Sequence, residues 1–237
     1  MKTRSKALLL SLCAVLLVAA SVLGTMAYLT DTEAVTNTFT VGSVGITLDE
    51  ADVRPDGTYE SGHDSRVPAN EYHLLPGHTY IKDPTVTVDA KSEDSYIRMM
   101  VKVDGLNDLK AAMPKDAFQT FYDEDLFLLQ NLCLNEKDEL TWDSDVWQYK
   151  AFHAEGTYAN CYEFRYIGND TVNPGNGIVV KSETPTVLPD LFTHITVPGE
   201  INNTQLAKLA NVKIVVTAHA IQADGFTNAD EAWKAFK

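Results

Sequence analysis

The chain has 237 residues and a formal net charge of −14 at pH 7. A surface this acidic argues against nucleic acids and anionic membrane surfaces as partners, because both would repel it. The length suffices for a full hydrophobic core, and no repeat period divides the sequence, so one folded domain is expected.

The beginning of the chain has the pattern of a secretory signal peptide. Three basic residues and no acidic residue lie in the first six positions, and the run 7–23 is apolar apart from Ser11 and Ser21. A basic start followed by such a run is typical of export signals. The alternative is an uncleaved membrane anchor. A helix that spans a bilayer needs about 20 apolar residues, and Ala7–Leu29 is just long enough to supply them. Both alternatives predict that the rest of the chain is exported.

Small side chains mark a cleavage point after the apolar run. Thr25 and Ala27 stand three residues and one residue before a cut that leaves Tyr28 first. A signal peptidase accepts small side chains at these two places. We therefore expect residues 1–27 to be removed and residues 28–237 to fold as a single secreted domain. The partners at this stage are the signal peptidase and, only transiently during export, the membrane.

Cysteine is scarce after the export segment. Only Cys133 and Cys161 remain, so at most one disulfide is possible, and the sequence leaves their pairing open. A secreted chain of this size with so few cysteines is expected to be held together by its core rather than by disulfides.

The first part of the mature chain alternates with a period of two residues. Val35, Phe39 and Val41 fall on one face of an extended segment, and threonines fall on the other. After Gly42 the alternation resumes through Val44–Leu48. β-Branched and aromatic residues at this period predict a half-buried strand.

The next segments predict a loop followed by strands. Residues 51–73 are polar and rich in Asp, Gly, Ser and His, which indicates a long exposed loop. The pair Pro76–Gly77 predicts a turn, with glycine where positive φ is needed. Thr85–Asp89 and Tyr96–Asp104 alternate cleanly around a short acidic connector, which favours two neighbouring strands of a β-meander.

The middle and the last third of the chain are more varied. Apolar residues at mixed spacing predict one or two short inserted helices within 105–160, where two tryptophans indicate either a buried cluster or a sugar-binding platform. Strand patterns return at Tyr162–Gly168. The segment Val187–Ile201 is interpreted as a proline-punctuated connection, and Asn211–Gly225 as a long central strand.

The end of the chain predicts a helix. Asn228 stands three residues before Glu231, the spacing of a capping box. Trp233 and Phe236 then share one helical face and are expected to hold the helix on a sheet. Many short strands, few helices and frequent turns predict a mainly β fold, an antiparallel β-sandwich with short inserted helices and this C-terminal helix.

No residue pattern selects an active site. His63, His73 and His78 form the densest histidine group, but their spacing does not place two ligands on adjacent helical turns, as zinc proteases require. They are interpreted as solvated, and His219, on a predicted strand, as a satisfied and partly buried residue. No nucleophile elbow, P-loop or dinucleotide fingerprint occurs. We therefore expect no catalytic residue, no metal and no cofactor.

The opening stretch GTMAYLTDTEAVTNTFTVGSVGITLDE resembles the start of exported proteins of the camelysin/TasA biofilm-matrix family of Gram-positive bacteria. The runs LLPGHTYIKDPTVTV, SYIRMMVKV and TAHAIQADGFTNADEAWKAF are similar to the same group. The resemblance implies a jelly-roll-like sandwich, cleavage by a dedicated signal peptidase of the endoplasmic-reticulum type, and assembly into extracellular fibres. It further implies that residues 28–41 of one subunit, with Val35, Phe39 and Val41, complete the sheet of the next.

Three hypotheses about function follow. The leading one is a secreted structural subunit of a fibre or biofilm matrix that associates with itself or with other matrix subunits. The second is a monomeric cell-surface binding module that uses the loop 51–73. The third is an exported metal-dependent protease, because camelysins have been classed as metalloproteases, and His63, His73 and His78 are then the candidate ligands. Catalytic residues are not transferred, because similarity of fold alone does not imply activity.

Overall fold

The structure is a computed structural model that describes residues 12–17, 42–60, 65–113, 142–168 and 176–236. Residues 12–17 are helical. The chain divides into two compact units, Met1–Val41 and Gly42–Lys237, and the second is described below. Among the described helices, none has the length and apolar character needed to cross a bilayer.

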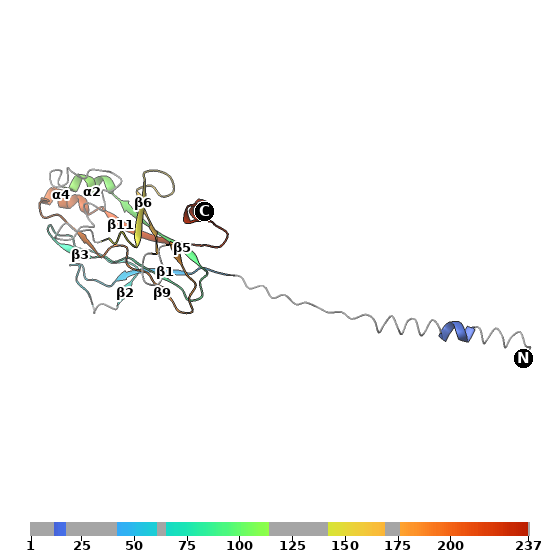
Figure 1. The fold of residues 1–237 in the computed structure, drawn as a ribbon. Coiled ribbons are helices and arrows are strands. Elements are labelled where there is room, and N and C mark those ends of the chain that lie inside the picture. Colours follow the sequence, from blue (N-terminus) through green and yellow to red (C-terminus); the bar gives the residue numbers. More distant parts are fainter. Residues whose placement is uncertain (1–11, 18–41, 61–64, 114–141, 169–175, 237) are drawn as a thin grey trace, which may run out of the picture. The chain divides into compact units, whose positions relative to one another are not determined.

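Short strands dominate the second unit, with three described helices between and after them (Figure 1). The strands are β1 (Ile46–Ala51), β2 (Arg66–Val67), β3 (Thr79–Ile81), β4 (Thr85–Val88), β5 (Ser95–Asp104), β6 (Trp147–His153), β7 (Cys161–Tyr166), β8 (Ile178–Val179), β9 (Thr186–Val187), β10 (His194–Thr196) and β11 (Lys213–Gln222). The helices are α2 (Leu106–Ala112), α4 (Asn203–Leu209) and α5 (Ala229–Ala235). The prediction of a mainly β fold with short helices and a C-terminal helix is confirmed.

The strands form three antiparallel sheets. One has the order β2-β1-β4-β9, a second pairs β10 with β3, and the third has the order β11-β5-β7-β6, with β8 also paired to β5. The prediction of a meander was wrong, because β4 and β5 belong to different sheets. Their short connector takes the chain from one sheet to the other instead of turning it back along its neighbour.

A shared core joins these sheets. Alternate residues of β5, from Ile97 to Val103, turn inward and meet Val86 and Val88 of β4. The aromatic side chains of β7, Tyr162, Phe164 and Tyr166, share one face of the strand and are buried in the same core. β5 lies between β11 and β7, and its side chains are buried on both faces along most of its length, by the core on one face and, around Tyr96 and Arg98, by α5 on the other. This explains why the adjacent Met99 and Met100, which lie on opposite faces, are both apolar and buried.

Of the two tryptophans within 105–160, Trp147 lies in the core and the partly exposed Trp142 packs against it, which favours the buried cluster over the sugar platform. Trp147 is fully buried and donates from Nε1 to the carbonyl of Pro189 at 2.9 Å. Trp142 packs edge-on against Phe164, with ring centroids 5.5 Å apart. Of the helices predicted in this region, α2 is present, and the segment also contains β6. Residues 114–141, including Cys133, lie outside the described part.

The prediction of a long exposed loop at 51–73 is only partly correct, because much of the described part is irregular and exposed while other parts pack on the sheet. It contains β2, which pairs with the end of β1, and its Val53 and Gly57 are buried. Gly57 has φ 82°, and a Cβ at this position would come within 2.7 Å of the Tyr80 ring. Tight packing against the sheet therefore explains this glycine, which composition alone assigned to a loop.

Two further predictions need correction. The segment Asn211–Gly225 forms a long strand, but β11 lies at the edge of its sheet and not at the centre. The connection Val187–Ile201 begins at the last residue of β9 and contains the three-residue strand β10. The turn at Pro76–Gly77 is confirmed, since Gly77 has φ 75° and the N–H of His78 donates to the carbonyl of Leu75 at 3.3 Å.

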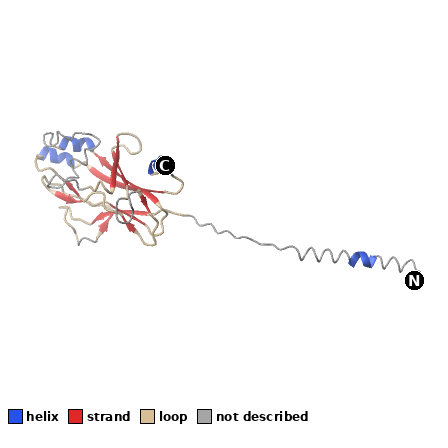
Figure 2. Cartoon of the chain, in the orientation of Figure 1, coloured by secondary structure: helices blue, strands red, loops and turns tan. Residues whose placement is uncertain are grey.

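The described helices of the second unit are each seven residues long, and side-chain caps stabilise the starts of α4 and α5. α2 and α4 lie side by side at one end of the unit (Figure 2). At α5, the side chain of Asn228 accepts from the N–H of Glu231 at 3.0 Å as predicted. The reciprocal half of the capping box is absent, because Glu231 accepts from the N–H and hydroxyl of Thr227 instead.

Candidate docking groove

β11 has one open edge. All ten of its residues are in register with β5, and along its other side no strand of the described residues pairs with it. The N–H of Ala223, directly after β11, donates to the carbonyl of Asp94 at 2.7 Å. Since N–H groups alternate between the two sides of a strand, the even-numbered residues of β11 direct theirs to the open edge. Such a row of unpaired groups is a template for another strand.

The side chains beside this edge are apolar and incompletely covered. Even-numbered residues of β11 pack on the core yet stay partly exposed, and β1, which contacts β11, contributes two more partly exposed residues. We call this row the seam, and its residues are Ile46, Leu48, Ile214, Val216, Ala218 and Ala220. Because β2 pairs only with Glu50 and Ala51, β1 has no second partner strand beside the seam among the described residues.

At the start of β11 the seam opens into a groove of about 690 Å³. Three segments form its walls: 70–74 before β3, 195–197 at the end of β10, and 206–215, which includes the end of α4 and the start of β11. Most of the lining is apolar, with Tyr72, Leu74, Leu206, Leu209 and Val215 among the lining residues. A concave apolar surface that ends beside an unpaired strand has the shape to accept an extended peptide with alternating side chains.

The α4 wall of the groove depends on a capping box that the sequence analysis missed. Asn202 accepts from the N–H groups of Thr204 and Gln205, and the Gln205 side chain accepts from the N–H of Asn202 at 3.0 Å. The sequence signal was the Asn–Gln spacing of three residues, the same kind of spacing that predicted α5. This cap fixes the start of α4 and so presents Leu206 and Leu209 to the groove.

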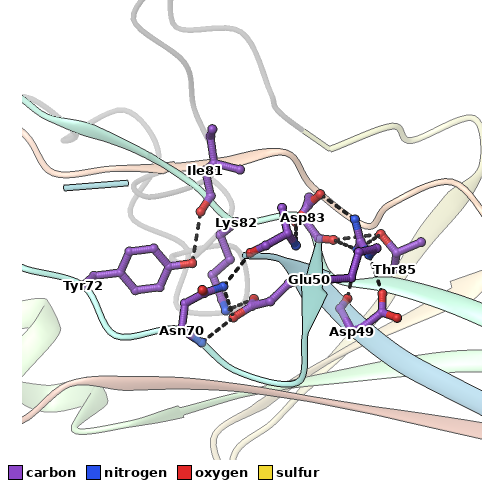
Figure 3. A network of polar contacts seen from close by, with 10 residues as sticks. Asp49, Glu50, Asn70, Tyr72, Ile81, Lys82, Asp83 and Thr85 are labelled. Carbon is purple, nitrogen blue, oxygen red and sulfur yellow. Dashed lines mark hydrogen bonds and ion pairs between the residues drawn. The ribbon is translucent and has the colours of Figure 1, made fainter. Parts of the chain in front are cut away.

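The opposite wall is fixed by a buried polar network (Figure 3). Lys82 and Glu50 form an ion pair of 2.6 Å in which each residue is less than a tenth exposed. Glu50 also accepts from the backbone N–H and the side-chain amide of Asn70, both at 3.0 Å. Tyr72 donates to the carbonyl of Ile81 at 3.0 Å. Burial and the nearby Glu50 carboxylate raise the pKa of Tyr72, so its hydroxyl stays a donor at neutral pH.

A second part of the network holds β2 to the sheet. Arg66 donates from Nε to Asp49 at 2.5 Å and from Nη1 to Asp83 at 3.0 Å, and its Nη2 reaches the hydroxyl of Thr85 at 2.7 Å. Burial opposes the charge of Arg66, but its hydrogen bonds with Asp49 and the charge of Asp83 outweigh that effect and raise its pKa. These acidic residues are therefore engaged in holding the chain together at the base of the 66–73 segment.

Removing one charge of the buried pair is expected to destabilise this wall. Lys82→Met leaves the Glu50 carboxylate buried without a cation, and we expect the free energy of unfolding to fall by about 3–5 kcal/mol. Urea denaturation measures the loss. The double variant Glu50→Gln, Lys82→Met removes both charges and should recover most of it. Equal losses in the single and double variants would show that packing, and not the unpaired charge, determines the effect.

The candidate histidines do not form a metal site among the described residues. His73 is exposed and lines the groove, while His78 is exposed and tilted against the Tyr80 ring, 6.4 Å between centroids. His63 lies outside the described residues. In the described ranges no three His, Cys, Asp or Glu side chains gather as a metal ion requires. The interpretation of His219 is confirmed, since it is partly buried and accepts from Arg98 Nε at 3.1 Å.

The other predicted functional residues lie in segments that are not described. These are the cleavage-site residues Thr25, Ala27 and Tyr28, and the assembly-strand residues Val35, Phe39 and Val41. Cys161 is buried and has no disulfide partner among the described residues, and Cys133 lies outside them, so their pairing stays open.

A search against models of protein families, a search of curated proteins and a search of solved structures each found no match to this chain. The resemblance to camelysin/TasA proteins therefore stays a prediction.

The folded unit begins far from the groove. The carbonyl of Ser43 accepts from the N–H of Glu93 at 3.0 Å, directly before β5. At this end of the sheet Ser95 pairs with Gln222, whereas the groove adjoins Lys213, which pairs with Asp104. The ten residues of β5 separate these two ends by about 30 Å. The N-terminal segment thus joins the unit at the end of the sheet opposite the groove.

Proposed function

We propose that this protein is a secreted structural subunit that polymerises into an extracellular fibre or matrix by donating its N-terminal strand. The observation that supports this proposal most directly is the unpaired edge of β11, which lies beside an apolar seam and groove. The sequence resemblance to matrix proteins agrees with it. A jelly-roll-like connection of the strands and processing by a dedicated signal peptidase belong to the same proposal.

The proposed occupant of the edge is residues 28–41 of another copy. A fully extended segment of about 14 residues spans about 46 Å, which exceeds the length of the ten-residue β11. Its alternation suits the site, because Val35, Phe39 and Val41 would face the seam while threonines face water. Main-chain hydrogen bonds to the edge supply affinity, and the apolar side chains supply register.

The positions of the two ends support a filament. The donor joins its own unit at one end of β5, and the groove opens at the other. Each contact joins two different surfaces on successive copies, so it is heterologous. A heterologous contact need not close into a ring, and the copies therefore add end to end as a filament. In that arrangement residue Val41 of the donor lies at the groove, and the donor runs antiparallel to β11. Opposite Val41 we place Ile214, which puts Phe39 opposite Val216 and Val35 opposite Ala220.

Cysteine cross-linking tests both the donation and its direction. In the antiparallel register Thr40 of one copy is opposite Val215 of the next, and Val215 is 44% exposed. Paired residues lie about 5 Å apart between Cα atoms, within reach of a disulfide. Thr40→Cys with Val215→Cys should therefore give covalent ladders on mild oxidation. Ala34→Cys with Val215→Cys should not, because those positions are about 20 Å apart.

Each outcome of this experiment has a distinct meaning. Ladders from the Ala34 pair alone would show that the strand is donated in the parallel direction. Single particles in negative-stain electron microscopy, with no ladder from either pair, would overturn strand donation. The parent chain under the same oxidation is the control for its own cysteines.

The rival functions have weaker support. A monomeric binding module is favoured by the same groove, and it predicts a protein that stays monomeric when concentrated. For an exported metalloprotease, the described residues offer no cluster of ligands, and His63 is outside them. Stoichiometric zinc after dialysis, with casein cleavage that a chelator stops, would restore that hypothesis.

A further inference from the structure

The outer face of the five-stranded sheet, on the side away from the core, carries a buried charge cluster under α5. Arg98 of β5 is 5% exposed and Glu163 of β7 is 3% exposed. Glu163 accepts from Arg165 Nε at 2.7 Å and lies 2.8 Å from His153 Nε2, but its nearest approach to Arg98 is 3.7 Å. Buried charges are costly unless well paired, so the remaining contacts of Arg98 matter for the stability of this face.

Arg98 links α5 to the sheet, in addition to the ion pairs of Asp230 in α5 with Lys150 of β6 and Arg165 of β7. Its guanidinium lies 4.5 Å from the ring centre of Trp233 and 5.0 Å from that of Phe236, with Tyr158 at 5.2 Å on the sheet side. Cation–π contacts are strongest where water is excluded, as here. An isolated helix of seven residues is unstable in water, so α5 stays folded only while it is docked.

His219 orients this arginine. The two residues are cross-strand neighbours, and Arg98 Nε donates to His219 Nδ1 at 3.1 Å. A nitrogen that accepts must keep its lone pair, so the imidazole is neutral with its proton on Nε2. The His219 ring also packs on Phe236, 4.8 Å between centroids, and therefore touches both the arginine and the helix end.

Among the residues that the structure describes, no spare anion is available to balance a proton on His219. The groups that face His219 are Arg98 of β5, Tyr158 of the loop before β7 and Phe236 at the end of α5. Glu163 of β7 lies behind Arg98. Glu163 is already engaged by Arg165 and His153. A second proton on the imidazole would bind Nδ1 and make it a donor as well. Two N–H donors and two positive charges would then face each other across the 3.1 Å contact.

We propose that His219 is a proton-operated lock on the C-terminal helix: the neutral imidazole holds Arg98 beneath α5, and protonation of the imidazole releases the helix from the sheet. The lock does not depend on the proposed strand donation, because it lies on the outer face of the sheet and involves neither the groove nor the seam.

The direction of the pH effect follows from linkage. Burial, and then the charge of Arg98, lower the pKa of His219 in the docked state, against an opposite effect of Glu163. In the released state the imidazole returns to its ordinary pKa of 6.5. The released state therefore binds more protons, so docking is strongest above pH 6.5, weakens as the pH falls below it, and levels off below the docked-state pKa.

Hydrogen exchange measured by mass spectrometry tests the lock in dilute, monomeric protein. α4 has the same length as α5 and serves as the internal reference, so that the ratio of the two exchange rates cancels the intrinsic effect of pH. We expect α5 to exchange faster relative to α4 as the pH falls from 7.5 to 5.5, by up to about tenfold per pH unit.

Two matched variants distinguish a lock from general acid lability. His219→Gln keeps an acceptor for Arg98 but cannot titrate, so the ratio should become independent of pH. His153→Gln changes the other histidine on this face and should leave the response in place. A flat ratio in the unmodified protein would overturn the proposal, and so would a response that persists in His219→Gln.

Discussion

A chain that begins at Gly42 will fold and will not form filaments, whereas the chain that begins at Tyr28 will form them. The folded unit starts at Gly42, and every buried core residue of the described ranges lies within it, so its stability should not depend on the removed residues. Assembly, in contrast, loses the donated strand entirely, and we expect complete loss of fibres. Negative-stain electron microscopy measures assembly, and thermal unfolding followed by circular dichroism checks the fold. Fibres formed by the shorter chain would contradict strand donation.

The alternation of residues 28–41 supplies a matched control for this result. Val35→Asp with Phe39→Asp puts two charges on the face that is expected to enter the seam, where burying unpaired charge costs several kcal/mol. Thr36→Asp with Thr38→Asp adds the same charge to the opposite, solvent-facing side. Only the first pair should stop assembly. Equal effects of the two pairs would mean that charge in this segment, and not its alternation, controls fibre formation.

Proline at position 218 will stop filament growth without unfolding the subunit. The N–H of Ala218 points to the open edge of β11, so Ala218→Pro removes no hydrogen bond to β5. Proline is tolerated at such edge positions, and the expected loss of stability is under about 2 kcal/mol. The incoming strand, however, meets a ring in place of a donor, and its ladder is interrupted in the middle of the seam.

The neighbouring residue provides the control. The N–H of Thr217 points to β5, so Thr217→Pro breaks a bond inside the sheet and should cost about 3 kcal/mol or more. Urea denaturation of both variants, with sedimentation of the Ala218→Pro protein, separates the two effects. Fibres that form normally from Ala218→Pro would show that the edge of β11 is not the acceptor.

Local sequence patterns predicted two of the strands and the C-terminal helix. The period-two runs at Tyr96–Asp104 and Tyr162–Gly168 became β5 and β7, and the spacing of Asn228 and Glu231 became the start of α5. These features depend on residues close together in the chain, where backbone geometry repeats every two residues in a strand and every 3.6 in a helix. The same reasoning applied to Asn202 and Gln205 would have found α4.

The candidate site was only partly predictable. Composition assigned 51–73 to an exposed loop, but Asn70 and Tyr72 form one wall of the groove because they meet Glu50 and Ile81 in the folded unit. The outward-facing Arg98 likewise gave no sign of its partners, since Trp233 lies far along the chain and meets Arg98 only when α5 docks.

By itself, the sequence determined that the protein is mainly β, acidic, and equipped with an apolar N-terminal run and an alternating segment at Val35–Val41. Only the tertiary structure decided that β11 is an edge strand and that the seam and groove lie beside it. The physical reason is that an apolar alternating strand has the same sequence at the centre of a sheet and at its edge. Its place depends on which distant segments pair with it, and in the described residues β5 pairs with one side of β11 alone.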